Sequence, residues 1–237
     1  MRRRTLVYIA CSPHRRVGTT TTTRLLADYF AFNKRPFQAF DTDSHESPFA
    51  ACFPGEAKVV DVNTVQGQIA LFDPLLVCDE VPKIVDVWNH SYRQFFAIIR
   101  EIGFFEEARR LAVEPILLFM ADRQASSIEA AQMLKRQWPD LMMVIVNNEG
   151  AAPLGPGVYD HLARYPSDRT FQIPPLDVAF RETIDNPDFS LSRFLIAPPA
   201  DMSIVLRSGL RSWLARIFAQ FHSFELRLTL QDTEYLG

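Results

Sequence analysis

The chain has 237 residues, which is enough for one α/β domain with a sizeable buried core. Hydrophobic residues make up 48% of it and charged residues 22%, and the formal net charge of −3 leaves only a local basic patch for nucleic-acid binding. No apolar run approaches the ~20 residues of a membrane-spanning helix. Cys11, Cys52 and Cys78 lack metal-ligand spacing and favour a reducing compartment, so we expect a cytoplasmic protein without a signal peptide.

A strand, a loop and the start of a helix follow one another in residues 5–23, TLVYIACSPHRRVGTTTTT. The apolar run at residues 6–11 predicts a buried strand of a parallel sheet, and residues 20–33 predict a helix with one apolar face. The first N–H groups of a helix have no intrahelical partners and point outward, so this geometry builds an anion site. Gly18 followed by hydroxyl residues is typical of a phosphate-binding loop, and the Thr20 hydroxyl is placed to bind Mg²⁺.

The loop departs from the strict phosphate-loop pattern G-x-x-x-x-G-K-[ST]. The first glycine position holds Pro13 and the lysine position holds Thr19, whereas Gly18 and Thr20 fit the pattern. The segment resembles the deviant loop of the ParA/MinD family of P-loop ATPases, which reads roughly K-G-G-x-G-K-[ST]-T. Both family lysines are missing, and some members of the TadZ/CpaE type, tied to pilus assembly, also lack the P-loop lysine. The corresponding residues, all implied to contact the nucleotide, are His14, Arg15, Arg16, Val17, Gly18, Thr19, Thr20 and Thr21.

Residues 37–40 predict a second short strand, which ends in Asp41-Thr42-Asp43. Acidic residues at the carboxyl end of a parallel strand face the crevice where ligands bind. The family has a D-x-D at this place, and the resemblance implies that Asp43 activates the attacking water. The alternative is a strand-to-loop junction with solvated acids.

Residues 57–62 predict a third strand and residues 65–72 a short helix. The apolar run at residues 75–78 predicts a fourth strand that ends in Asp79, which is the arrangement of a Walker B motif. The surrounding sequence loosely follows the family pattern, which implies that Asp79 holds Mg²⁺ through water. An ordinary buried strand with a capping aspartate is the alternative.

The stretch at residues 87–111 is rich in aromatic residues at roughly helical spacing, with a break expected at Gly103. One interpretation is a helix that packs on the sheet. The other is a partner-facing surface, because aromatic residues are enriched at interfaces and this region helps to form the partner-facing surface in dimeric family members.

Two more strands are predicted at residues 115–120 and 141–146, with a helix at residues 128–138 between them. The second of these strands ends in Asn147, where the family places an asparagine that contacts the adenine base. An asparagine side chain offers a donor and an acceptor, as recognition of a purine edge requires. A turn asparagine is the alternative, since asparagine is common in turns.

The C-terminal part is predicted to contain a short helix at residues 159–165 and a last strand at residues 170–173, followed by Pro174. Family members run from such a strand into a proline loop beside the base and then into a helix, here residues 177–184, which implies that Pro174 lies near the nucleotide. Residues 185–201 predict a polar loop. The closing helix at residues 203–224 either covers the sheet or, as a basic amphipathic helix, lies on an anionic membrane as the C-terminal segment of MinD does.

Alternating strands and helices around a strand–loop–helix phosphate site predict an α/β fold, namely a doubly wound, mostly parallel sheet of about seven strands flanked by helices. We expect residues 1–237 to form a single domain, with a core at about residues 5–190 and the closing helix at about residues 203–224. The likeness to the ParA/MinD family covers about residues 5–190, in pattern rather than residue by residue.

Three functional hypotheses follow from the resemblance and from the missing lysines. The first is a ParA/MinD-like protein for intracellular positioning, partitioning or assembly, with weak or absent ATP hydrolysis, weak binding of ATP or ADP with Mg²⁺, and protein partners or a homodimer. The second is an active ATPase in which Arg15 or Arg16 replaces the lysines. The third is a structural subunit with no nucleotide site, whose loop is filled by arginine side chains. Association with DNA or with a membrane surface would need a local basic surface.

Overall fold

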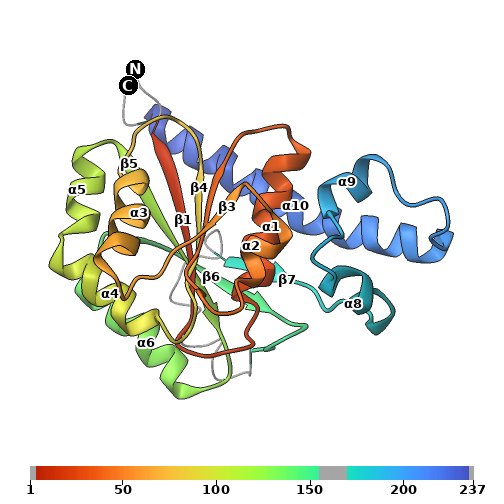
Figure 1. Cartoon of the computed structure of the whole chain (residues 1–237), viewed down its shortest axis with the longest axis horizontal. Coiled ribbons are helices and arrows are strands. Elements are labelled where there is room, and N and C mark those ends of the chain that lie inside the picture. Colours follow the sequence, from red (N-terminus) through yellow and green to blue (C-terminus); the bar gives the residue numbers. More distant parts are fainter. Residues whose placement is uncertain (1–3, 155–169, 235–237) are drawn as a thin grey trace.

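The computed structural model describes residues 4–154 and 170–234. Its centre is a seven-stranded, all-parallel sheet in the order β3-β2-β4-β1-β5-β6-β7 (Figure 1), so the predicted fold class is confirmed. The helix predicted at residues 159–165 lies outside the described residues. The strands are β1 (Thr5–Cys11), β2 (Gln38–Asp41), β3 (Ala57–Val59), β4 (Lys83–Asp86), β5 (Val113–Ala121), β6 (Met142–Asn148) and β7 (Thr170–Ile173).

Helices cover both faces of the sheet (Figure 1). Residues of α3, α4, α5 and α6 share one apolar core layer with Val7, Ile9 and Cys11 of β1, and residues of α1, α2, α8, α9 and α10 share the other layer with Tyr8 and Ala10. Successive residues of β1 therefore point into two apolar layers, which is why this strand reads as one continuous apolar run. The helices are α1 (Thr19–Phe32), α2 (Pro48–Cys52), α3 (Val65–Leu75), α4 (Tyr92–Glu101), α5 (Phe104–Arg110), α6 (Ala125–Gln137), α8 (Val178–Asp185), α9 (Leu191–Ile196) and α10 (Ile204–Glu234).

The winding of the chain places β1 at the centre of the sheet. From β1 the chain passes through α1 to β2 and β3, returns to β4 beside β1, and then adds β5 on the other side of β1. In open α/β sheets, ligands bind at the carboxyl ends of the strands, at the point where the direction of winding changes. The carboxyl ends of β1, β2, β4 and β5 therefore form the edge where a site is expected.

The strand predicted at residues 75–78 is wrong. Leu75 is the last residue of α3, and it is buried together with Leu71, one helical turn earlier. The fourth strand is β4. The sequence pattern does not predict it, because this strand begins with a lysine. Lys83 is fully buried, and its Nζ donates to the Asp79 carboxylate at 2.7 Å and to two loop carbonyl oxygens at 3.0 and 3.2 Å. These partners compensate for the burial of the charge in a central strand.

The aromatic stretch after β4 packs on the sheet. It forms α4 and α5, which are separated at Gly103, whose φ of +62° is the expected break. Phe95, Phe96, Phe104 and Phe105 all lie in the core beneath these helices. These four side chains are therefore occupied inside the molecule rather than offered to a partner.

The closing helix, α10, has 31 residues and is longer than predicted. One side of it, with Trp213 and Phe221, is buried in the core layer that contains α1 and β7, which confirms that it covers the sheet, whereas Ile204, Val205, Leu226 and Leu230 are exposed. Gln220 also reaches the edge strand β7, where its side-chain amide accepts from the N–H of Gln172 and donates to the carbonyl of the same residue, both at 2.8 Å. Within the described residues, no helix combines the length and the apolar composition needed to cross a bilayer.

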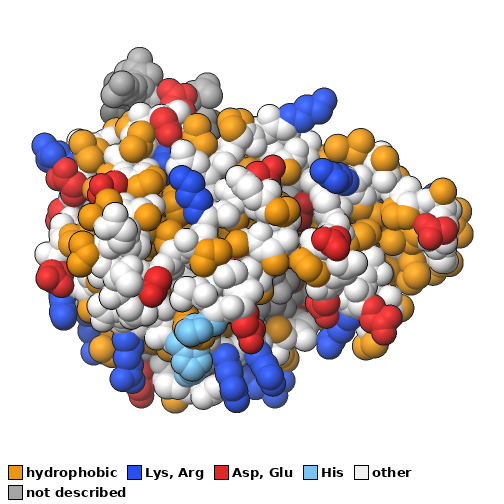
Figure 2. All heavy atoms as spheres, viewed as in Figure 1, with side chains coloured by type: hydrophobic (Ala, Val, Ile, Leu, Met, Phe, Trp, Pro, Cys, Tyr) orange, Lys and Arg blue, Asp and Glu red, His pale blue; other side chains and the backbone are white. Residues whose placement is uncertain are grey.

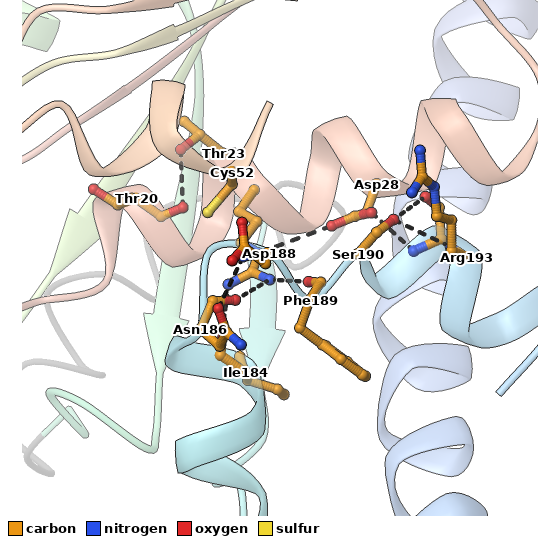
Figure 3. A network of polar contacts seen from close by, with 12 residues as sticks. Thr20, Thr23, Asp28, Cys52, Ile184, Asn186, Asp188, Phe189, Ser190 and Arg193 are labelled. Carbon is orange, nitrogen blue, oxygen red and sulfur yellow. Dashed lines mark hydrogen bonds and ion pairs between the residues drawn. The ribbon is translucent and has the colours of Figure 1, made fainter. Parts of the chain in front are cut away.

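Two side chains of α1 hold the segment that carries α8 and α9. The guanidinium group of Arg24 donates to the carbonyl oxygens of Ile184, Asn186 and Phe189. Figure 3 shows these three residues close to α1, together with Asp28. The carboxylate of Asp28 accepts a backbone N–H from the first turn of α9 at 2.8 Å. The segment predicted as a polar loop thus contains a helix, α9, and is fastened to α1.

Candidate phosphate and magnesium site

The loop between β1 and α1 has two residues in the left-handed region, Arg16 with φ of +60° and Gly18 with φ of +95°. Glycine adopts this conformation freely, whereas for a residue such as arginine it costs ~1–2 kcal/mol. Space at position 18 is also tight, because a Cβ atom there would lie 2.0 Å from Nδ2 of Asn148 and this side-chain amide would have to move. The side chain of Val17 is buried in the core and anchors the loop between these two turns.

The first turn of α1 presents a row of threonines to the pocket. Thr19, Thr20 and Thr21 occupy the first three positions of this helix, and all three line the pocket. Their backbone N–H groups have no acceptors within the helix, and this first turn contains no acidic residue. The hydroxyl of the next residue, Thr22, donates to the carbonyl oxygen of Gly18 at 2.9 Å and fixes the turn. This end of α1 is therefore suited to an anion such as phosphate.

A strand-end carboxyl group lies beside this helix start. The hydroxyl of Thr20 donates to Oδ2 of Asp86 at 2.7 Å. Asp86 is the last residue of β4, pairs with Ala10 of β1, and is only 3% exposed. A hydroxyl at the helix start and an aspartate at the end of a strand are the two protein groups that hold Mg²⁺ in P-loop NTPases. Sequence reasoning missed Asp86 because it placed the strand at residues 75–78.

Asp79 lies at the amino ends of the strands, at the opposite end of the sheet from Asp86, so the prediction that it holds Mg²⁺ is wrong. Its backbone N–H donates to Oγ1 of Thr5, the first residue of β1, at 2.9 Å. Its carboxylate is paired with Lys83, the first residue of β4. Asp79 thus neutralises a buried lysine. The signal that could have found the correct aspartate was the run Lys-Ile-Val-Asp at residues 83–86.

The carboxyl group of Asp86 is buried among other acids. Burial, and after it the charge of Asp41, raise the pKa of Asp86 to about 8, while the hydrogen bond from Thr20 acts in the opposite direction. Without a cation, this carboxyl group is therefore mostly protonated at neutral pH. A divalent cation bound next to it would favour the carboxylate form.

The two other acids of the pocket are tied to the backbone. The carboxylate of Asp41 accepts the N–H of Asp43 at 3.0 Å and two N–H groups of α2 at 2.9 and 3.0 Å, and burial raises its pKa. Oδ1 of Asp43 accepts the N–H groups of the second and third residues after it, at 3.0 and 3.1 Å. Asp43 thus lines the pocket and also holds a turn, and its role in activating water stays a prediction.

These groups surround one pocket of about 280 Å³. Arg15 and Arg16 are exposed and belong to its lining. Figure 2 shows basic and histidine side chains gathered along the lower margin of the molecule, the margin near which α6 is drawn in Figure 1. The lining residues are His14, Arg15, Arg16, Gly18, Thr19, Thr20, Thr21, Asp41, Asp43, Pro48, Asp86, Val87, Trp88, Asn89 and Ala151.

Three predicted nucleotide contacts lie outside this lining: Val17, whose side chain is buried in the core, and two residues from the end of the sheet. Asn147 is 1% exposed within β6, and the carbonyl oxygen of Pro174 accepts the indole N–H of Trp213 at 2.9 Å. Their contacts with an adenine base stay predictions. The residues that follow β4, Trp88 and Asn89, line the pocket instead, and sequence reasoning missed them together with the strand.

His14, the first of the loop residues expected to contact the nucleotide, is held by groups from outside the loop. Its Nδ1 lies 2.6 Å from Oδ2 of Asp122, which follows β5, and its Nε2 lies 3.1 Å from Oγ of Ser126 in α6. These partners are 108 and 112 residues away in the sequence, and no local sequence pattern predicts their contacts with His14. The orientation of the His14 ring is therefore fixed by two contacts.

The donor set fits Mg²⁺, and it fits a phosphate group in part. Mg²⁺ prefers oxygen ligands and keeps several waters, and Thr20 and Asp86 supply a hydroxyl and a carboxyl oxygen. In the part of the chain that the structure describes, no cluster of three or more His, Cys, Asp or Glu side chains could hold a metal ion. A cation here would therefore depend on phosphate oxygens and water as well. For a phosphate group, the unpaired backbone N–H groups at the start of α1 are present, whereas the positive charge of a lysine in the loop is missing.

Comparisons with known proteins give the chain no family. A scan against protein-family models finds no match, and no curated protein matches the sequence significantly. Fourteen chains of solved structures match, and one of them is described as the nucleotide-binding protein from Archaeoglobus fulgidus in complex with ADP, with cobalt. It is 15% identical, with a TM-score of 0.47, over 78% of this chain and 87% of that chain. A likeness at this level carries no argument about function.

Proposed function

We propose that this chain is a ParA/MinD-like protein that binds ATP or ADP with Mg²⁺ and serves intracellular positioning, partitioning or assembly, with weak or absent ATP hydrolysis. The observation that carries the nucleotide site is the 2.7 Å hydrogen bond from Thr20 to Asp86. It joins the start of the helix after β1 to the end of the neighbouring strand, beneath a loop whose Gly18 leaves little room for a side chain.

In this proposal the chain's own groups divide the work of binding. The free N–H groups in the first turn of α1 receive phosphate oxygens, and the helix dipole favours their negative charge. Thr20 and Asp86 hold Mg²⁺, which neutralises phosphate charge when it is bound. Arg15 and Arg16 add positive charge from the loop.

Weak hydrolysis follows from the missing charges. A lysine about 4 Å from a phosphate charge is worth ~4 kcal/mol at an effective dielectric constant near 20, and Thr19 supplies no charge. His14 is engaged with Asp122 and Ser126, so it does not replace the signature lysine that crosses to the partner subunit in the family. We propose that the protein therefore acts mainly through protein partners or as a homodimer, with DNA or a membrane surface as further partners only if a basic surface forms locally.

The active-ATPase alternative is favoured by one observation, namely that Arg15 and Arg16 line the pocket. The alternative without any nucleotide site is disfavoured by another, because both arginines are exposed and a pocket of about 280 Å³ remains. ATP turnover that Arg15→Ala or Arg16→Ala abolishes would favour the active enzyme over our proposal.

Calorimetric titration of the protein with Mg²⁺-ATP and Mg²⁺-ADP tests the proposal. We expect binding that weakens at least about tenfold in Thr20→Ala and in Asp86→Asn, since each removes one group that positions the cation. Asp73→Asn, an exposed position on α3, and Thr183→Ala, on α8, are matched controls that should bind as the wild type does. An absence of binding up to millimolar nucleotide would refute the proposal and favour the structural subunit.

A further inference from the structure

Three side chains beside the phosphate loop form a chain of contacts that the proposed function does not use. Nδ1 of His14 lies 2.6 Å from the carboxylate of Asp122, and Nε2 of the same ring lies 3.1 Å from Oγ of Ser126. The order is carboxylate, imidazole, hydroxyl. The groups come from three separate elements: the loop after β1, the residue after β5, and α6. A nucleophile, a base and a group that orients the base are recognised by such geometry and not by their order in the sequence.

The aspartate in this chain is rigidly placed. Asp122 is 5% exposed, its Oδ1 accepts the N–H of Gln124 at 2.9 Å, and its own N–H donates to Oγ of Ser127 at 3.2 Å. Its Oδ2 is thereby directed to His14. A carboxylate at Nδ1 requires the proton on that nitrogen, so Nε2 of the neutral ring is left as an acceptor for the Ser126 hydroxyl.

The serine is open to solvent, as a nucleophile must be. Ser126 is exposed and is the second residue of α6, a helix of 13 residues. Among residues 4–154 and 170–234, the backbone N–H groups of Ala125 and Ser126 find no acceptor, since they belong to the unpaired first turn of the helix. N–H groups in this position can stabilise the negative oxygen that forms when a carbonyl group is attacked.

We propose that Ser126, His14 and Asp122 form a nucleophilic triad that cleaves small carboxylic esters. Oγ of Ser126 bonds to the ester carbonyl carbon while its proton moves to Nε2 of His14. The carbon–oxygen bond to the alcohol then breaks, and His14 returns the proton to the departing alcohol, which leaves an acyl group on Ser126. Water attacks this acyl group, gives its proton to His14, and the proton passes back to Oγ when the carboxylic acid departs. Asp122 keeps the ring oriented throughout.

This activity is distinct from nucleotide binding: it uses neither the N–H groups of α1 nor Thr20 and Asp86, and of its three residues only His14 lines the phosphate pocket. The competing explanation is a structural tie that fastens the phosphate loop to α6. A tie and a triad differ in what they predict for reactivity, since a tie gives the serine no enhanced nucleophilicity.

The test uses the whole protein and two probes, p-nitrophenyl acetate and a fluorophosphonate. We expect a burst of p-nitrophenol of about one equivalent per chain, with an acetyl group located on Ser126 by peptide mass spectrometry. Ser126→Ala should abolish the burst and the fluorophosphonate label, and His14→Gln and Asp122→Asn should slow acylation about 100-fold. Ser208→Ala, an exposed serine on α10, is the matched control and should react as the wild type does.

Melting temperatures of all variants show whether each is folded, so that a lost reaction is not mistaken for a lost fold. Ser126 is exposed, and its replacement by alanine should leave the melting temperature nearly unchanged. The proposal is overturned if the wild type shows neither burst nor label, if Ser126→Ala remains labelled to the same extent, or if His14→Gln and Asp122→Asn react at the wild-type rate. Each of these results would leave the contacts as a structural tie.

Discussion

Replacing Asp86 by asparagine should make the stability of the protein less dependent on pH. The pKa of this carboxyl group is about 8 in the folded chain, against an ordinary value of 3.8, chiefly because of burial. The folded state therefore prefers the protonated form more strongly than the unfolded state does. The stability from this preference is fully present below pH 3.8 and is lost as the pH rises through about 8.

The size of the effect follows from the two pKa values. At ~1.4 kcal/mol per pKa unit, the difference between 3.8 and about 8 corresponds to ~6 kcal/mol over the whole range, of which ~4 kcal/mol is lost by pH 7. Asparagine keeps the shape of the side chain and does not ionise. Asp86→Asn should thus match the wild type near pH 4 and exceed it in free energy of unfolding by several kcal/mol at pH 8, in the absence of nucleotide and Mg²⁺.

Urea unfolding of both proteins, followed by circular dichroism at pH 4, 6 and 8, measures this difference. Subtracting the two curves removes the contribution of titrating groups that do not interact with Asp86. Asp73→Asn should show no such trend, because Asp73 is exposed on α3. A difference between Asp86→Asn and the wild type that stays flat from pH 4 to 8, or that favours the wild type at pH 8, would refute the reasoning.

Three further substitutions probe the loop and the clamp. Arg16→Gly should raise the free energy of unfolding by ~0.5–1 kcal/mol, because φ of +60° costs arginine more than glycine loses in chain entropy; an unchanged or lower melting temperature would contradict this. Gly18→Ala should cost more than ~2 kcal/mol, and adding Asn148→Ala should restore part of the loss, since the new Cβ would meet Nδ2 at 2.0 Å; equal loss in the single and double variants would speak against that contact. Arg24→Ala should cost ~3 kcal/mol and expose residues 184–189 to limited proteolysis, because three carbonyl oxygens lose their donor; an unaltered cleavage pattern would show that the clamp is dispensable.

Local patterns sufficed for the centre of the fold. Residues 6–11 form a strand buried on both faces, and the turn at Gly18 and the run of threonines mark the loop and the start of α1. The fourth strand was lost because a short apolar run fits the end of a helix as well as a strand, and because a lysine at the start of β4 argued against burial. Only the tertiary structure shows that Lys83 is neutralised by Asp79 from the preceding loop.

The candidate site also contains residues that local sequence patterns predict and residues that they do not. Thr20 belongs to a contiguous motif, and the sequence predicts it as a Mg²⁺ ligand. Asp86 is not predicted, because the sequence pattern places the fourth strand at residues 75–78 and so indicates Asp79 for this role. The contacts of His14 had no signal in the sequence, since Asp122 and Ser126 join it only when β1, β5 and α6 come together. Pairings over more than 100 residues depend on the tertiary arrangement of the elements, which local sequence patterns do not reveal.

The contact of Gln220 with β7 affects whether copies of this chain can associate through the edges of their sheets. The outer edge of β7 exposes a peptide group at Gln172 that could template another strand, and the Gln220 amide meets its N–H and its carbonyl together. A side-chain amide has the same donor and acceptor as a peptide bond, so α10 imitates one link of an eighth strand without supplying the rest. The sheet is thereby terminated from within the chain, and growth into edge-to-edge polymers is blocked at this position.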